Sequence, residues 1–123
     1  MLNQIILVGR LTKDPEIQET DKNKKYSHIT VAIPRSFKNM DGEYESDFIN
    51  CTLWDAVAKS TVEFCKKGDI VGIKGRVQSR LVEQDNEKKY YMDVIAERVT
   101  FLSSKNNKEK DELEQQEKTQ VTE

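Results

Sequence analysis

The chain has 123 residues, which is enough for one small domain that buries a core without disulfides or metal ions. Its formal net charge is -2, 36% of its residues are hydrophobic, and no apolar stretch is long enough to cross a membrane. These values argue against a membrane-spanning protein. The first residues do not resemble a secretion signal, and Cys51 and Cys65 lack the spacing of a zinc site, so we expect a soluble, cytoplasmic protein with buried structural thiols.

The charge is distributed unevenly along the chain. Residues 1–104 contain 16 basic and 16 acidic residues, whereas residues 105–123 contain four basic and six acidic ones. The C-terminal segment therefore carries the whole net negative charge. A neutral body can still bind phosphate if its basic residues line one face, so the composition does not exclude a nucleic-acid ligand.

Short apolar runs bounded by turn residues predict an all-β domain. We expect the first strand at residues 4–11, with a short extension at 16–19 after Asp14 and Pro15. The second strand, at residues 26–34, alternates in polarity. The alternation places Ile29, Val31 and Ile33 toward the core and His28, Thr30 and Ala32 on the other face.

The third strand is predicted at residues 47–54, after a loop with an Asp41-Gly42 turn signal. Its alternation points Ile49, Cys51 and Leu53 inward and Phe48, Asn50, Thr52 and Trp54 outward.

A helical spacing then replaces the alternation, which predicts one short amphipathic helix at residues 56–67. Ala58, Val62 and Cys65 form its apolar side, Asp55 is the expected N-cap, and Gly68 lies just past the end.

The fourth strand is predicted at residues 70–81 and the fifth at 89–102, separated by a polar loop at 83–88. On the fourth strand we expect Val71, Ile73, Val77 and Leu81 inward, and Lys74, Arg76, Gln78 and Arg80 outward.

The order of elements predicts the fold. Three strands, one helix and two closing strands are typical of a five-stranded oligonucleotide-binding (OB) barrel, although small barrels of other topology have similar strand counts. We expect this domain to span residues 1–104. Residues 105–123 lack aromatic residues and apolar periodicity, which predicts a disordered charged tail.

The third strand carries the most informative functional signal. Phe48 and Trp54 stand on the face opposite the core, and unpaired bases gain about 1 to 3 kcal/mol each by stacking on such rings. Lys74, Arg76 and Arg80 share the outer face of the next strand, where they could neutralise phosphates. Rings and cations without a set of base-reading side chains indicate binding of single-stranded nucleic acid with little sequence preference.

Other interpretations of the same residues stay open. Each ring could pack under the helix, a loop or a partner subunit, and the cations could form an ordinary solvated face. The nearest alternative function is a protein-interaction barrel whose rings form a subunit interface; a close variant binds RNA. Phe37 and Tyr44 lie in a polar loop with little core to enter, which favours a binding role. The sequence predicts no cofactor or metal site and gives little support to catalysis.

Four stretches resemble bacterial single-stranded DNA-binding proteins, in order and at family spacing. They are residues 1–16, residues 47–51 with Trp54, residues 66–69 and residues 71–80, and the resemblance covers about residues 1–103. It implies an OB barrel that assembles as a homotetramer and wraps single-stranded DNA during replication, recombination and repair.

The resemblance also implies that the principal stacking rings are Phe37, Phe48 and Trp54. A fourth position, usually aromatic in the family, is Val82 in this chain, with Tyr90 or Tyr91 as possible replacements. The family usually ends in an acidic tip closing on Pro-Phe, which recruits partner enzymes. This chain ends in Lys-Thr-Gln-Val-Thr-Glu, so we expect weak or absent recruitment of repair and replication enzymes.

Overall fold

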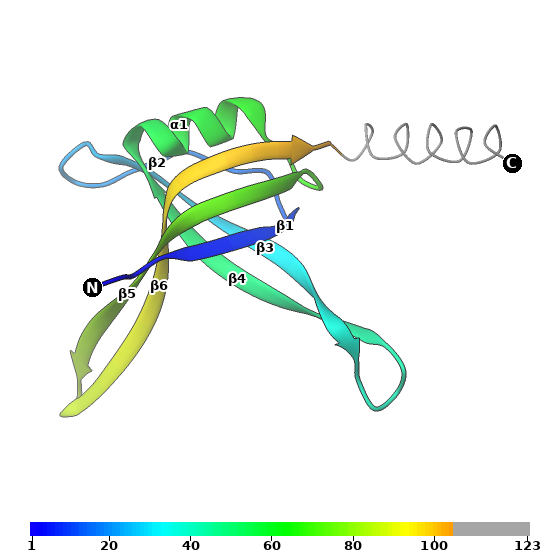
Figure 1. The fold of residues 1–123 in the computed structure, drawn as a ribbon. Helices are drawn as coiled ribbons and strands as arrows, with labels where there is room; N and C mark the ends of the chain where they lie inside the picture. The colour runs from blue at the N-terminus through cyan, green and yellow to red at the C-terminus, as the bar shows by residue number, and fades with distance from the viewer. Residues whose placement is uncertain (105–123) are drawn as a thin grey trace, which may run out of the picture.

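The computed structural model describes residues 1–104, which form a closed barrel of five strands with one short helix (Figure 1). The strands are β1 (Ile5–Leu11), β3 (Lys25–Lys38), β4 (Tyr44–Trp54), β5 (Ile70–Gln84) and β6 (Glu87–Ser103), with a two-residue strand β2 (Gln18–Glu19) at one edge. The helix α1 (Asp55–Phe64) connects β4 to β5. The predicted disordered tail, residues 105–123, lies outside the described residues.

Strand pairing confirms the predicted barrel. The sheet order is β1-β5-β6-β4-β3-β2, and a further pairing of β1 with β3 closes the barrel. All pairs are antiparallel except β4 with β6, which run parallel over three residues. No helix within residues 1–104 is long and apolar enough to span a membrane.

The core lies inside the barrel, where the alternation placed it. The largest fully buried apolar side chains are those of Leu11, Ile29, Val31, Leu53, Val71 and Ile73. Ala58 of α1 and Cys65 just after the helix close one end of this core. Because successive strand residues point to opposite faces, burying one set of side chains fixes the other set on the outer face of the barrel.

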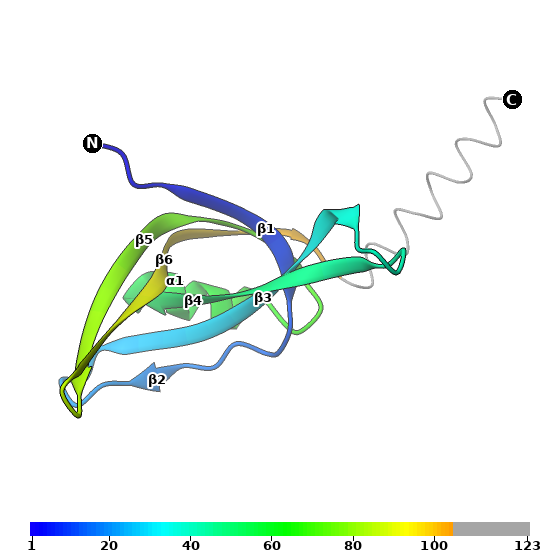
Figure 2. The same cartoon turned by 90° about the horizontal axis from the view of Figure 1, so that it is seen from below.

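Two long hairpins extend from the end of the barrel opposite α1 (Figure 1). The β3–β4 arm, residues 32–48, begins at the Ala32–Phe48 pair, where β3 makes its last pairing with β1. The β5–β6 arm, residues 78–93, begins at the Gln78–Asp93 pair, just past the pairing of β6 with β4. Seen from below, the arms point to opposite sides of the molecule (Figure 2).

The arms correct two sequence predictions. β3 continues to Lys38 and β4 begins at Tyr44, so most of the predicted loop before the third strand is hairpin. The predicted polar loop at 83–88 is a two-residue turn at Asp85 and Asn86, both with positive φ. This backbone conformation is the one that a tight antiparallel hairpin requires.

Leu81 was expected in the core, but its side chain is 45% exposed. It lies on the β5–β6 arm, beyond the barrel, where neither face of the hairpin is covered by another strand. The alternation of apolar and polar residues along β5 continues to Leu81, but the buried core of the barrel ends before that residue.

The helix differs from the prediction at both ends. Its N-cap residue is Trp54 and not Asp55, and no side chain caps the first turn. The helix ends at Phe64 and not at Lys67, because Cys65 is extended and buried in the core. The backbone N–H of Lys66 then donates to the Asp69 carboxylate at 2.8 Å, which holds the following turn.

Both cysteines are free and buried, as predicted. Burial raises the pKa of the Cys51 thiol to about 11. Burial also raises the pKa of Cys65, with a further contribution from the negative charge of Asp69. Both thiols are therefore protonated near neutral pH, which suits structural residues and not reactive ones.

Candidate nucleic-acid interface

The outer face of β4 presents two aromatic rings. Phe48 is 65% exposed and Trp54 is 37% exposed, while Cys51 and Leu53 between them are buried. The structure excludes the alternative that Phe48 packs under α1 or a loop of residues 1–104. A large ring left open on a rigid strand is a surface on which a flat apolar group can stack.

Trp54 belongs to a cluster of three rings that sequence reasoning missed in part. Its partner across the strands is Tyr26, with ring centroids 5.4 Å apart and planes tilted by 43°. His28 lies 5.1 Å from Tyr26, and its Nδ1 is 3.2 Å from the Thr52 hydroxyl. The alternation of β3 carried the signal for Tyr26, because it has the same parity as the outward residue His28.

The β3–β4 arm adds exposed rings beyond the barrel. Phe37 is 82% exposed and Tyr44 is 62% exposed, and the Lys38 ammonium lies 5.5 Å from the Tyr44 ring centroid. Phe37 lies within the irregular stretch of the β3–β4 register between Pro34 and Lys38, so it is separated from the aligned rows that carry Phe48 and Trp54.

An arginine on the same arm forms ion pairs with two neighbouring carboxylates. Arg35 contacts Asp47 at 2.7 Å and Glu45 at 2.9 Å. The hydrogen bond and charge of Arg35 lower the pKa of Asp47. These ion pairs join β3 to β4 and place two carboxylates beside the Arg35 charge.

The outer face of β5 carries the predicted cations, but they differ in their surroundings. Arg76 is 3.8 Å from Glu97, and Arg80 donates to the Asp93 carboxylate at 3.1 Å. Within residues 1–104, Lys74 has no ion pair. Lys74 therefore keeps its full charge for a ligand, whereas the two arginines share theirs with carboxylates.

One row of side chains joins the rings to the cations. Thr52 on β4 pairs with Ile95 on β6, and Ile95 pairs with Arg76 on β5. Paired residues on neighbouring strands share a face, so β4, β6 and β5 form one continuous outer face. Because β6 lies between them, the β4 and β5 strands are about 10 Å apart. Lys74 lies further around the barrel, beside Ile6 of β1. Exposed rings and cations on one surface suit a ligand with flat bases and a phosphate backbone.

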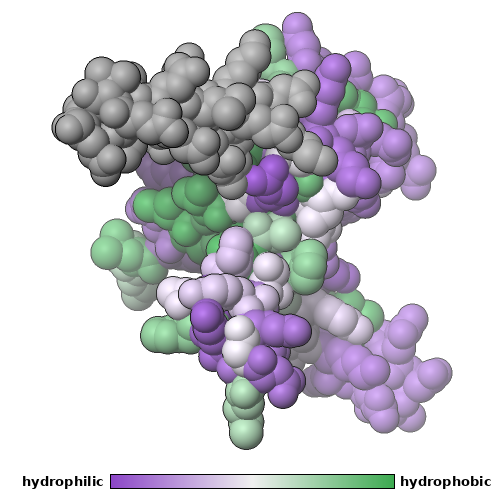
Figure 3. All heavy atoms as spheres, turned by 90° about the vertical axis from the view of Figure 1, so that its right-hand side faces the viewer, coloured by the Kyte–Doolittle hydropathy of each residue, from purple (hydrophilic) through white to green (hydrophobic). Residues whose placement is uncertain are grey.

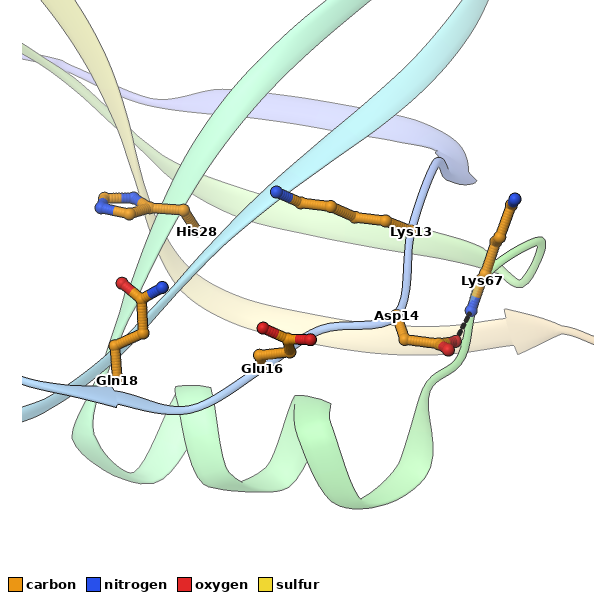
Figure 4. A pocket seen from close by; sticks show the side chains of 6 residues that line it. All are labelled: Lys13, Asp14, Glu16, Gln18, His28 and Lys67. Atoms are coloured by element: carbon orange, nitrogen blue, oxygen red, sulfur yellow. Dashed lines mark hydrogen bonds between the residues drawn. The ribbon is translucent and has the colours of Figure 1, made fainter.

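A polar hollow of about 420 Å³ borders His28. Its lining residues come from the segment before β2, from β2 and β3, and from the turn after α1: Lys13, Asp14, Glu16, Gln18, His28 and Lys67 (Figure 4). The Lys67 backbone N–H donates to Asp14 at 2.7 Å, and the two lysines are matched by two carboxylates. Residues 1–104 contain no group of His, Cys, Asp and Glu side chains that could hold a metal ion.

The chain is similar to known proteins over most of its described residues. The model of a family described as the single-strand binding protein family matches residues 2–102. The chain is 45% identical over 106 residues to the single-stranded DNA-binding protein B of Bacillus subtilis (strain 168), covering 85% of this chain and 94% of that protein. It is 44% identical over 108 residues to the single-stranded DNA-binding protein 2 of Listeria monocytogenes, covering 87% of this chain and 68% of that protein.

A solved structure is similar over the same region. It is a deletion mutant of the single-stranded DNA binding protein from Thermus aquaticus, with a TM-score of 0.69 and 26% sequence identity. The match covers 85% of this chain and 52% of the Thermus chain, so this chain spans about half the length of that protein.

Proposed function

The chain belongs to the single-strand binding protein family, and we propose that it binds single-stranded DNA by stacking bases on Phe37, Phe48 and Trp54 while Lys74, Arg76 and Arg80 neutralise phosphates. Proteins of this family bind DNA and are not enzymes, and their general role is to protect single strands during replication, recombination and repair. The observation that supports this assignment of residues is the continuous outer face of β4, β6 and β5, with exposed rings at one side and cations at the other.

Base stacking explains why little sequence preference is expected. Every base has a flat face, so a ring such as Phe48 accepts any of them, whereas sequence reading needs side chains aimed at base edges. The neutral charge of residues 1–104 fits a protein that depends on stacking as well as on charge.

Trp54 provides the direct test because it is the only tryptophan of the chain. We expect oligothymidine to quench its fluorescence on binding, and we expect a matched duplex to bind much more weakly. Affinity should fall as salt rises, because the Lys and Arg side chains of the protein displace counterions from the DNA phosphates on binding. Equal affinity for duplex, or saturation without quenching, would contradict the proposal and favour the protein-interaction barrel.

We also propose that the protein assembles as a homotetramer. Ile6 and Val8 are exposed on the outer face of β1, and Leu2 is exposed in the segment before it. Leu102 lies 3.5 Å from the position that a Cβ at Gly72 would occupy, and Gly72 pairs with Val8. Apolar surface gathers on this side of the barrel, at the left of Figure 3. An exposed apolar face of this kind is a common site of subunit contact.

Light scattering tests the assembly. We expect a mass of four times 14.3 kDa for the full chain, and a smaller mass for Ile6→Glu, which places a charge on the β1 face. A single-chain mass at micromolar concentration would contradict the tetramer.

We propose a cytoplasmic location, which suits a DNA-binding protein with two free cysteines, Cys51 and Cys65.

A further inference from the structure

We infer that Tyr91 on the β5–β6 arm is an additional base-stacking residue and that its neighbour Tyr90 is not. The inference rests on the proposed function, because it extends the same single-strand path onto the second arm. Both rings are exposed, Tyr90 at 73% and Tyr91 at 44%, so exposure alone does not distinguish them. The strand register does.

Tyr91 lies on the face of the predicted cations. The register of β5 with β6 pairs Arg76 with Ile95 and Arg80 with Tyr91. Residues of the same parity on one strand share a face, so Tyr91 stands on the outer face with Arg76.

Tyr90 lies on the opposite face of the same hairpin. It pairs with Leu81, which has the parity of Val77, and Val77 pairs with the buried residue Val94. The face of Tyr90 is therefore the continuation of the core side of the barrel. A single strand of DNA that follows the outer face from β4 to β5 would contact Tyr91 and not Tyr90.

The position of Tyr91 corresponds to that of Phe48. In the parallel pairing of β4 with β6, Thr52 is opposite Ile95. Phe48 precedes Thr52 by four residues and Tyr91 precedes Ile95 by four, so both rings stand on the outer face. Beyond this pairing, the two strands separate into the two arms (Figure 1). Phe48 and Tyr91 therefore stand at the same number of residues along their strands from the Thr52–Ile95 pair that joins them.

Neighbouring side chains hold the Tyr91 ring in place. The Arg80 guanidinium lies 5.1 Å from the ring centroid, and its Nε donates to Asp93 at 3.1 Å. A ring that is already ordered loses less conformational entropy when a base stacks on it. A small hollow of about 100 Å³ beside the ring includes Val82 and Lys89, but also Asp85 and Glu87. Because these carboxylates offset Lys89, the contribution we assign to Tyr91 and this hollow is stacking, and the phosphate contact proposed for the arm stays with Arg80.

The test compares the two tyrosines in the full chain. Binding of fluorescein-labelled oligothymidine, followed by anisotropy, should weaken at least about fivefold in Tyr91→Ala, the lower end of the range for one stacked base. The matched variant Tyr90→Ala should change affinity less than about twofold, and Tyr91→Phe should bind like the unaltered protein. Equal losses in Tyr90→Ala and Tyr91→Ala would overturn the inference, because the arm as a whole would then matter and not its outer face.

A rescue experiment separates stacking from a structural role. Val82 pairs with Lys89 on the same face as Tyr91, whereas Leu81 is on the face of Tyr90. Adding V82Y to the Tyr91→Ala protein should restore affinity, and adding L81Y should not. Rescue by L81Y, or no rescue by V82Y, would overturn the inference.

Oligothymidine binding and Trp54 quenching by the unaltered protein separate the role of Tyr91 from the proposed function. If the unaltered protein binds oligothymidine and quenches Trp54 while Tyr91→Ala binds equally well, the inference alone fails. If the unaltered protein shows neither binding nor quenching, the proposed function fails with it.

Discussion

The barrel and its two arms are built from the same strands but obey different constraints. In the barrel, Ile29, Val31 and Leu53 are at most 1% exposed, and the residues between them face outward. On the arms, both faces of the hairpin are open: Leu81 and Tyr91 stand on opposite faces of the β5–β6 arm and are 45% and 44% exposed. Buried side chains of the barrel therefore decide stability, whereas the side chains on its outer face and on the arms are free to contact a ligand.

This difference explains how a small domain presents a long binding surface. A strand that leaves the barrel keeps its hydrogen bonds to its hairpin partner, so the backbone stays ordered without further core. Each arm also carries an arginine held by carboxylates, Arg35 by Glu45 and Asp47, and Arg80 by Asp93. These exposed ion pairs join the two strands of each arm.

The largest expected effect tests the barrel. Leu53→Ala removes a side chain that is 0% exposed, so the free energy of unfolding should fall by about 2 to 5 kcal/mol. Leu81→Ala, the same chemical change on the arm, should cost less than about 1 kcal/mol. Urea denaturation followed by circular dichroism measures both. Similar losses in the two variants would show that the arm packs as firmly as the barrel.

A smaller effect is expected for the outward ring at the base of the β3–β4 arm. Phe48→Ala should weaken binding of oligothymidine by about 1 to 3 kcal/mol, because it removes stacking surface, with little change in the urea midpoint. Anisotropy titration and denaturation of the same preparation give the two values. If the urea midpoint drops sharply and the affinity of the folded protein is unchanged, Phe48 stabilises the barrel by packing and does not stack on bases.

The barrel could be predicted from the sequence because its signal is local. Burial of one face imposes a period of two, and that period was visible around Ile29 and around Cys51. The arms have no buried face to impose it, so residues 35–38 and 44–46 were predicted as loop although they form strands. The alternation at Leu81 misled for the same reason: a pattern continues after the core that would use it has ended.

The candidate site could be predicted only in part. Phe48 and Trp54 followed from parity within one strand. The pairing of Trp54 with Tyr26, and of Arg80 with Asp93 and Tyr91, depends on the register between strands, which one strand's pattern does not contain. For the same reason, the sequence did not distinguish Arg80 from Lys74, whereas the structure places Arg80 in an ion pair with Asp93 and gives Lys74 none within residues 1–104.

The smallest expected effect compares a cation of the barrel with a cation of the arm. Lys74 has no ion pair within residues 1–104, whereas Arg80 donates to Asp93. If Lys74 contacts one phosphate, Lys74→Ala should reduce the slope of log affinity against log salt by about 0.7. Arg80→Ala should reduce it less, because a guanidinium that stays with its carboxylate releases fewer counterions. Titrations with oligothymidine at four salt concentrations give both slopes. A larger change in Arg80→Ala would mean that the Asp93 pair opens when DNA binds, and the arm would then contribute charge as well as stacking surface.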